Sequence, residues 1–227
     1  MAKRVLVVAA HPDDELLGEG ATIRRLVDEG AVAHALIMAE GVTSRARTRE
    51  EANSEELEAL KADARAAAET IGFEEITFSG YPDNRMDSVD LLDVVKTVSD
   101  HIDRFEPEVI FTHHHGDLNI DHRIVCEAVL TATRPMEDCP VKRIYSFETP
   151  SSSEWEFGAL GSFVPNVFFD VSATLDAKLA GMACYREESR LSPHPRSPEA
   201  LQALAEYRGS IAGCKYAEAF HLLREVI

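Results

Sequence analysis

Short apolar runs rich in Val, Ile and Phe alternate along this chain with longer segments of helical periodicity. This alternation predicts strands that are each followed by a helix, which is typical of a mostly parallel sheet with helices on both faces. The predicted strands are Arg4–Ala10, Ala33–Met38, Ile76–Phe78, Val109–Thr112, Arg143–Phe147 and Val167–Val171. The predicted helices are Leu16–Asp28, Glu50–Thr70, Leu91–Arg104, Arg123–Ala132, Leu175–Glu188 and Glu199–Ala212. We therefore expect a Rossmann-like α/β fold in a single domain, residues 1–227.

The composition argues against several classes of function. The chain has 227 residues and a formal net charge of -17. Nucleic acids and anionic membranes are bound by clustered Lys and Arg, so this acidic balance argues against both partners. The apolar run Val5–Ala10 is too short for a signal peptide or a membrane span. We expect a cytoplasmic protein.

The cysteines do not indicate a structural site. The chain has four, which are widely spaced and form no CxxC pair: Cys126, Cys139, Cys184 and Cys214. This pattern predicts neither a thiolate zinc site nor a disulfide framework. We expect reduced and mostly buried thiols.

Acidic and histidine side chains gather where two of the predicted strands end. The first strand runs into AHPDDE at Ala10–Glu15, and the fourth runs into HHHGDLNIDH at His113–His122. By itself the first turn has a simple explanation, since Asp13 or Asp14 suits the N-cap of the following helix. The carboxyl ends of parallel strands meet at one edge of a sheet, however, so the two turns are expected to converge.

A catalytic zinc takes three protein ligands and leaves one position open for water. His11, Asp14 and His122 offer two imidazoles and one carboxylate for such a site. Asp13 would then be free to take a proton from the bound water. Two histidines and a carboxylate also suit Fe(II), so a non-haem iron oxygenase is an alternative, although the spare aspartate favours hydrolysis.

The two motifs together resemble those of the PIG-L/LmbE-like family of zinc-dependent N-deacetylases. Further segments, GVTSR, YPDNRMD, SSSEW and KYAEAF, extend the resemblance over nearly the whole chain. The resemblance implies one Zn²⁺ per chain and a small-molecule substrate. It also implies removal of the N-acetyl group from an N-acetylglucosamine-like sugar or sugar conjugate, which releases acetate and a free amine.

The resemblance implies the same site residues as the donor set: His11, Asp14 and His122 as ligands and Asp13 as general base. Many members carry a histidine three residues before the last ligand, and this chain has Asn119 there. An amide can donate a hydrogen bond to an oxyanion but cannot deliver a proton to a leaving amine. We therefore expect Asp13 to return the proton and Asp121 to orient its neighbours; the remaining candidate proton donors are His113, His114, His115 and His194.

Several further residues are predicted to contact substrate: Arg45, Asp83, Asn84, Arg85, Trp155, His194 and Arg196. Four of them, Arg45, Trp155, His194 and Arg196, have a simpler alternative. Arg45 leads into a charge-dense segment that suits a solvated helix, and Trp155 is as well suited to packing. The PHPRS segment at Pro193–Ser197 is typical of a rigid turn before a helix.

Two expectations concern assembly and a rival function. The resemblance and the acidic balance suggest a homo-oligomer, a trimer or hexamer, in which Ser189–Phe220 contributes to subunit contacts or to the substrate mouth. Gly18 and Gly20 form a fragment of a dinucleotide-binding fingerprint. A pyrophosphate at that helix N-terminus would face Asp13, Asp14 and Glu15, which argues against a nucleotide-binding module.

Overall fold

The computed structural model describes residues 3–45, 53–137 and 139–227, and its centre is one seven-stranded sheet. The strand order is β3-β2-β1-β4-β5-β7-β6. The strands are β1 (Arg4–Ala9), β2 (Val32–Ala39), β3 (Glu75–Tyr81), β4 (Val109–His113), β5 (Arg143–Phe147), β6 (Val167–Asp170) and β7 (Ala217–Glu225). All pairings are parallel except those of β7 with β5 and β6. The predicted mostly parallel α/β fold is confirmed.

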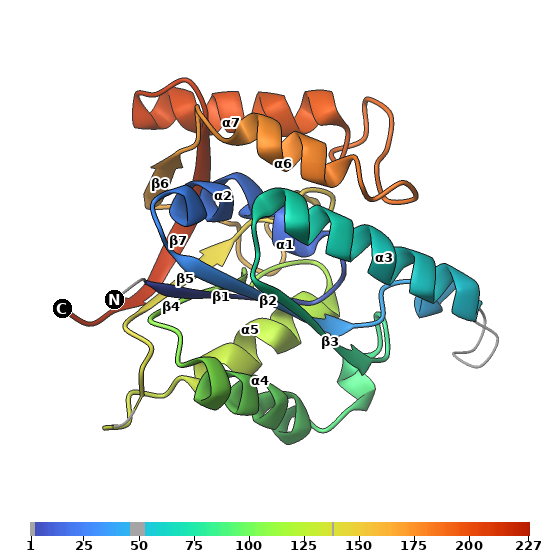
Figure 1. The fold of residues 1–227 in the computed structure, drawn as a ribbon, viewed down its shortest axis with the longest axis vertical. Helices are drawn as coiled ribbons and strands as arrows, with labels where there is room; N and C mark the ends of the chain where they lie inside the picture. The colour runs from blue at the N-terminus through green and yellow to red at the C-terminus, as the bar shows by residue number, and fades with distance from the viewer. Residues whose placement is uncertain (1–2, 46–52, 138) are drawn as a thin grey trace.

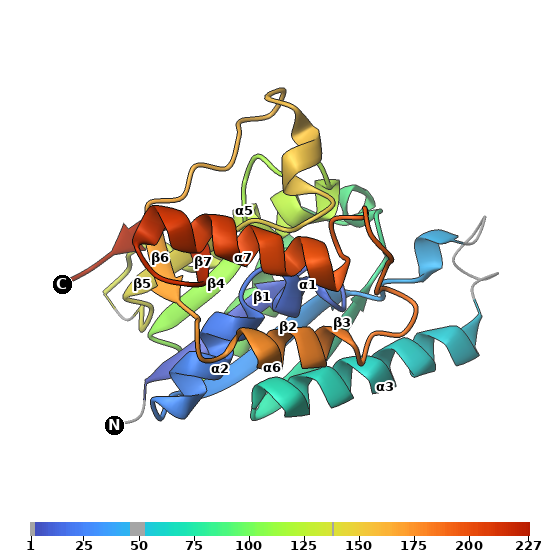
Figure 2. The ribbon, with the colours of Figure 1, turned by 90° about the horizontal axis from the view of Figure 1, so that it is seen from above.

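Helices cover both faces of the sheet (Figure 1). On one face lie α1 (Asp14–Leu17), α2 (Gly20–Asp28), α3 (Ser54–Ile71), α6 (Leu175–Met182) and α7 (Pro198–Ala212). The other face is covered by α4 (Leu91–Phe105) and α5 (Ile120–Ala132). Figure 2 shows α3, α6 and α7 running across the first face, with the segment between β5 and β6 projecting beside them.

Successive side chains of β1 point to opposite faces of the sheet, so this strand contributes to the apolar cores on both faces. Val5, Val7 and Ala9 belong to the apolar core under α1, α2 and α3. Leu6 and Val8 point the other way, into the core under α4 and α5. Because Val5–Ala9 is buried on both faces, this part of the strand is a continuous apolar run, as is typical of parallel central strands.

β1 lies between β2 and β4, which places a topological switch point at its carboxyl end. The chain moves outward from β1 to β2 and β3 on one side, and β4 and β5 follow on the other. Ligands of open α/β sheets bind outside the carboxyl ends of the strands at such a point. The two motif turns follow β1 and β4, so the fold brings them together there.

Two predicted helices differ from the structure. Leu16–Asp28 is divided into α1 and α2, because the carboxylate of Glu218 accepts hydrogen bonds from the backbone N–H groups of Ala21 and Thr22 and caps a new helix there. The helix predicted over Leu175–Glu188 ends at Met182. The chain then turns so that the buried Tyr185 reaches Glu15.

The last strand, β7, was not predicted. Its first four residues, Ala217–Phe220, are all buried, including Glu218, which is paired with Lys178 inside the protein. They pair with β6 and β5 inside the sheet, while the contribution of Ser189–Phe220 to subunit contacts or to the substrate mouth stays a prediction. The helix predicted from Glu50 begins at Ser54, capped by Asn53; Glu50–Ala52 lie outside the described residues.

Two compositional expectations can be compared with the structure. The four cysteines are free, but only Cys126 is buried, and the other three are partly exposed. Among the described residues, no helix combines the length and the apolarity that crossing a membrane requires.

Candidate active site

The turn after β1 buries three consecutive carboxylates. Asp13 and Asp14 are each 1% exposed, and Glu15 is fully buried. Asp13 has a φ of 105°, which is a strained value for a residue with a side chain. Its backbone N–H donates to Glu15 Oε2 at 2.9 Å, and the Tyr185 hydroxyl donates to Glu15 Oε1. Glu15 therefore stabilises the strained backbone conformation of Asp13, whose side chain lies in the site.

The turn after β4 is fixed by Asn119, the N-cap of α5. Its side-chain Oδ1 accepts from the Asp121 backbone N–H at 2.9 Å, and its own backbone N–H donates to Asp117 Oδ1 at 2.9 Å. The cap places Asp121 and His122 in the first turn of α5, where both are buried. Capping by Asn at this position satisfies a helix N–H that would otherwise have no partner.

The two turns bring three potential metal ligands together. Asp14 Oδ2 lies 3.2 Å from His11 Nδ1 and 3.2 Å from His122 Nε2. The two imidazole nitrogens are 3.3 Å apart. All three ligand atoms fall within 4.8 Å of one another, although the residues come from two motifs that are far apart in the sequence.

The chemistry of this donor set fits a divalent metal ion. Asp14 Oδ1 is buried and has no hydrogen-bond partner, so the carboxylate has capacity for a further ligand. Burial by itself would raise the pKa of Asp14, but the charge of His122 and hydrogen bonds from both histidines hold it well below its usual value. Burial would lower the pKa of His122, but Asp14 and Asp117 raise it to about 9. Two imidazoles and a carboxylate suit zinc, and they suit Fe(II) as well.

Carboxylates on the far side of each histidine fix its orientation. His11 Nε2 lies 3.1 Å from Asp121 Oδ2 and 3.3 Å from Asp83 Oδ1. Asp121 in turn accepts the backbone N–H groups of Asn84 and Met86. This second cluster also has metal-ligand spacing. Its carboxylates are already hydrogen-bonded, however, and a carboxylate behind a ligating histidine is the usual arrangement in metal sites.

His122 has an equivalent partner. Its Nδ1 lies 3.1 Å from Asp117 Oδ1, and Asp117 also accepts hydrogen bonds from the hydroxyls of Ser152 and Ser153. Burial would raise the pKa of Asp117, but His122 and the two serines lower it. The negative charge of Asp117 beside Nδ1 favours a proton on that nitrogen, which leaves Nε2 for a metal.

The base candidate Asp13 has a cationic neighbour. Arg196 Nη1 donates to Asp13 Oδ2 at 2.5 Å. Burial raises the pKa of Asp13 well above its usual value, and the positive charge of Arg196 opposes this rise. The carboxylates of Asp14, Glu188 and Glu15 act in the same direction as burial.

A polar cavity of about 200 Å³ opens between the two turns. We refer to it as the site cavity. It contains His11, His122 and Asp13 together with four of the other predicted residues: Asp83, Asn84, Asn119 and Arg196. Ser44, Ser151, Ser152 and Glu188 also line it and were not predicted. A larger cavity of about 520 Å³ lies between α3 and residues 186–188, but it holds none of the metal-ligand candidates.

Comparison with known proteins identifies the family. Residues 6–133 match the model of the PIG-L family, described as GlcNAc-PI de-N-acetylase, over more than half of the chain. The chain belongs to the PIG-L family. A probable N-acetyl-alpha-D-glucosaminyl L-malate deacetylase 2 of Bacillus cereus is 28% identical over 195 residues, 83% of this chain and 85% of the relative.

Solved structures extend the likeness of this PIG-L protein to its whole length. A conserved protein of Thermus thermophilus superposes with a TM-score of 0.78 at 24% identity, covering 100% of this chain and 97% of the other. The 4-carboxy-2-hydroxymuconate hydratase GalB of Pseudomonas putida KT2440 has a TM-score of 0.75 at 24% identity, with 99% and 98% coverage. At this identity both show the fold alone, and the hydratase indicates that the fold can carry other chemistry.

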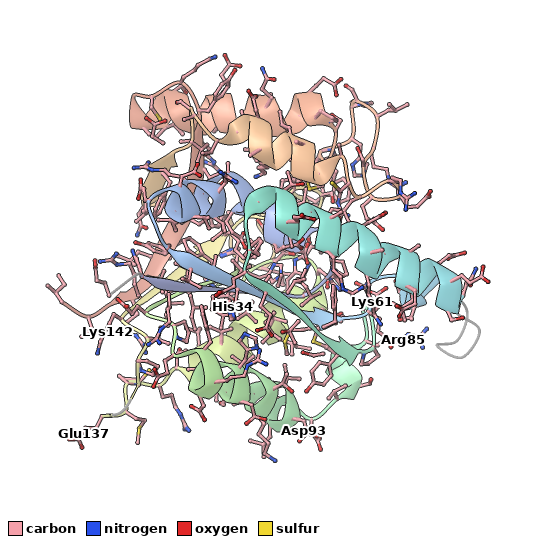
Figure 3. All side chains as sticks on the ribbon, in the orientation of Figure 1. His34, Lys61, Arg85, Asp93, Glu137 and Lys142 are labelled. Carbon is pink, nitrogen blue, oxygen red and sulfur yellow. The ribbon has the colours of Figure 1, made fainter. Side chains whose placement is uncertain are left out.

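The remaining predicted substrate residues of this PIG-L protein lie outside the described lining of the site cavity. Arg85 is exposed, beyond the carboxyl end of β3 (Figure 3). Trp155 is 39% exposed and meets the ring of His194 edge-on at 6.0 Å. Arg45 ends a short 3-10 helix, and its side chain is outside the described part of the chain. Their contact with substrate stays a prediction.

The three adjacent histidines diverge, as successive side chains at the end of a strand should. His113 Nε2 accepts the backbone N–H of Ala10, and burial lowers its pKa well below the usual value, so this nitrogen has no proton to give. His114 Nε2 lies 2.7 Å from the Gly161 carbonyl oxygen, and His115 is exposed. His113 is therefore a supporting residue that stacks on His122 at 3.9 Å, rather than a proton donor.

Sequence reasoning missed Asp117, Glu15 and Tyr185. Asp117 and Glu15 stand inside the two quoted motifs, and their acidic character was the available signal. Tyr185 lies 170 residues from Glu15, so nothing in the local sequence connects the two.

Proposed function

We propose that this PIG-L protein is a zinc-dependent hydrolase that removes the N-acetyl group from an N-acetylglucosamine-like sugar or sugar conjugate. The observation that carries the proposal is the convergence of His11, Asp14 and His122 on one point, at a polar cavity that His11, His122 and the base candidate Asp13 line together. A carboxylate next to a two-histidine, one-carboxylate donor set is what a metal-assisted amide hydrolysis needs.

The atoms that would hold the ion are His11 Nδ1, a carboxylate oxygen of Asp14 and His122 Nε2. When bound there, zinc supplies Lewis acidity and a water molecule of lowered pKa. Asp121 and Asp83 hold His11 from behind, and Asp117 holds His122. These contacts fix the direction of both imidazole rings before a metal ion binds.

Asp13 moves the proton in both halves of the proposed reaction. It accepts a proton from the water that attacks the acetamide carbonyl carbon, and it then carries that proton as a carboxylic acid. When the carbon–nitrogen bond breaks, Asp13 returns the proton to the leaving nitrogen, so the products are acetate and a free amine. No histidine is required as a separate acid, which suits a chain with Asn119 at the usual histidine position.

Asn119 supports the negative charge that develops on the carbonyl oxygen. Its Oδ1 is used by the Asp121 backbone N–H, so its Nδ2 group is the part left for other partners. One hydrogen of Nδ2 is donated to Asn84 Oδ1 at 2.8 Å. The amide carries a second N–H, which is the donor proposed for the oxyanion.

The character of the site cavity supports a hydroxylated substrate. Its lining is rich in hydroxyl, amide and carboxylate groups, contributed by Ser44, Asn84, Ser151 and Glu188 among others. Such groups exchange hydrogen bonds with sugar hydroxyls. The Bacillus cereus relative, named for a glucosaminyl malate, supports an amino sugar at the reacting end.

The deciding experiment is an acetate-release assay on the purified chain. N-acetylglucosamine, N,N'-diacetylchitobiose and N-acetylglucosaminyl malate are each incubated with enzyme reconstituted with zinc, with chelator-treated enzyme, and with zinc enzyme under anaerobic conditions. We expect acetate from at least one substrate with zinc, none after chelation, and the same rate without oxygen. Turnover that requires Fe(II) and oxygen would instead support the oxygenase alternative.

The predicted trimer or hexamer can be checked on the same sample. Sedimentation at micromolar concentration should give a species larger than one chain. A monomer at that concentration would remove the prediction.

A further inference from the structure

Arg196 is the only Arg or Lys among the described residues that line the site cavity. It lies between α6 and α7, immediately before Ser197, whose side chain caps α7. Sequence reasoning placed it among the substrate contacts. Its observed partners point to a different task.

Protein groups already engage the guanidinium of Arg196. Nη1 donates to Asp13 Oδ2 at 2.5 Å, and Nε donates to Ser151 Oγ at 2.8 Å. Nη1 also lies 3.5 Å from Glu188 Oε2. The Arg196 side chain is 23% exposed and that of Asp13 is 2% exposed, so the contact is largely shielded from water. A charge-assisted hydrogen bond in such surroundings is stronger than one at the surface.

The contact distinguishes the two oxygens of the base. Arg196 holds Oδ2 of Asp13, whereas Oδ1 is not part of this ion pair. The fork of Arg196 is anchored at Ser151 on one side, so it fixes the direction of the carboxylate as well as its position. A base that is displaced by about 1 Å can lose on the order of 10²-fold in rate, so this constraint has catalytic weight.

We propose that Arg196 is a positioning residue for Asp13: it clamps Oδ2 so that Oδ1 is the oxygen that exchanges the proton with water and amine. This inference rests on the proposed hydrolase function. The base motif near the N-terminus is thus completed by a residue 183 positions away. The segment from Glu188 to Ser197, which carries the clamp, must be in place for the base to be correctly oriented.

The first test separates positioning from substrate binding. Arg196→Met and Arg196→Lys should lower kcat by about 10- to 100-fold while KM changes little and bound zinc stays stoichiometric. The matched control is Arg186→Met, which removes another arginine of the connection between α6 and α7; Arg186 pairs with Asp63 outside the site cavity. Its kcat and KM should equal those of the wild type. A raised KM with unchanged kcat for Arg196→Met would overturn the proposal and assign Arg196 to substrate binding.

Chemical rescue of kcat is a second test. A residue with a purely structural role would not be replaced by an added small molecule. Millimolar guanidinium ion should restore part of the lost kcat of Arg196→Ala, because a small guanidinium can occupy the vacated position beside Asp13. Methylammonium at the same concentration should restore less, since it lacks the planar fork. Asp13→Asn should not respond to either ion. Absence of rescue together with loss of zinc from the Arg196 variants would assign the residue to folding and overturn the proposal.

A third experiment needs no substrate, so it can distinguish failure of the positioning role of Arg196 from failure of the proposed hydrolase function. Urea unfolding of Asp13→Asn, Arg196→Met and the double variant forms a double-mutant cycle. The two changes should be non-additive by more than the experimental error, because the side chains touch. Additive effects would show that the clamp is not formed in solution and would overturn this inference. An inactive wild type with a clear coupling would instead count against the proposed function while leaving the contact intact.

Discussion

Asp117 Oδ1 lies 3.1 Å from His122 Nδ1, so a carboxylate in the loop before α5 holds the imidazole that follows in its first turn. Two serine hydroxyls, from Ser152 and Ser153, hold the same carboxylate from the β5–β6 segment. Three parts of the chain therefore determine which nitrogen of His122 faces Asp14. Changing the partner behind a metal ligand typically costs about 10- to 100-fold in metal affinity.

Asp117→Asn should weaken zinc binding by about 10- to 100-fold, because an amide no longer stabilises the proton on His122 Nδ1. Competition against a chromogenic chelator measures the change. Asp87→Asn, at an exposed acid, should leave the affinity unaltered. Equal affinities for wild type and Asp117→Asn would contradict the role given to Asp117.

Removing any one of the three ligands should deplete the metal. His11→Ala, Asp14→Ala and His122→Ala each leave two donors, which is too few for a stable mononuclear site. Metal analysis of the purified variants should give clearly less than one zinc per chain, whereas His115→Ala, at an exposed histidine, should keep a full complement. Stoichiometric zinc in all three ligand variants would remove the site.

Asp13→Asn should separate metal binding from catalysis. Asp13 is not among the three ligand residues, so zinc should remain. Turnover should fall by roughly 10²- to 10⁴-fold, the usual value of general acid–base catalysis. If Asp13→Asn stays active while His194→Ala abolishes turnover with zinc retained, the proton is handled elsewhere.

His101 predicts an acid-dependent loss of stability remote from the site. It is buried on α4, with Nδ1 3.3 Å from Arg104 Nη2. Burial, followed by the charges of Arg104 and His34, lowers its pKa to about 4. The unfolded chain then binds a proton that the folded chain refuses, so stability is complete above about pH 6.5 and falls as the pH drops toward 4.

The size of this loss of stability follows from the difference between the pKa of His101 in the folded chain and in the unfolded chain. Between about pH 8 and pH 5, the free energy of unfolding of the wild type should fall by about 2 kcal/mol more than that of His101→Gln. Urea unfolding of metal-free samples at both pH values makes the comparison, and the ionisable groups of the site cancel between the two proteins. Parallel losses in the two proteins would contradict it. His34, labelled in Figure 3, stacks on Phe105 beside His101 and is unchanged in the variant.

The strands of the parallel part of the sheet were predictable because their chemistry is local. Val5–Ala9 is an unbroken apolar run, and such runs occur where a strand is buried on both faces. The metal-ligand candidates were predictable for the same reason, since each motif lies in one short turn. Their convergence followed from the rule that parallel strands end at one edge.

The contacts that escaped sequence reasoning all join distant segments. Glu218 caps α2 across 196 residues, and Arg196 reaches Asp13 across 183. A helix break at Gly18–Glu19 has no local cause of its own, because the cap that starts α2 comes from β7. Tertiary partners of this kind override local propensity, so periodicity alone joins α1 and α2 into one helix.

Asn119 combines two functions that substitutions can separate. Its Oδ1 caps α5 and its Nδ2 is the proposed oxyanion donor. Asn119→Ala should lose about 1 kcal/mol of stability with the cap, and up to roughly 10²- to 10³-fold in rate with the donor. Asn119→Asp keeps an acceptor for the Asp121 backbone N–H but loses the hydrogen bond to Asn84 Oδ1 and has no N–H to give. It should therefore keep the helix cap that Asn119→Ala loses, while its rate falls. Asn119→His restores an acid at this position, and its pH–rate profile should change with zinc content unaltered. Equal rates for wild type and Asn119→Asp would show that the amide donates nothing to the reaction, and Asn119 would then be a helix cap alone.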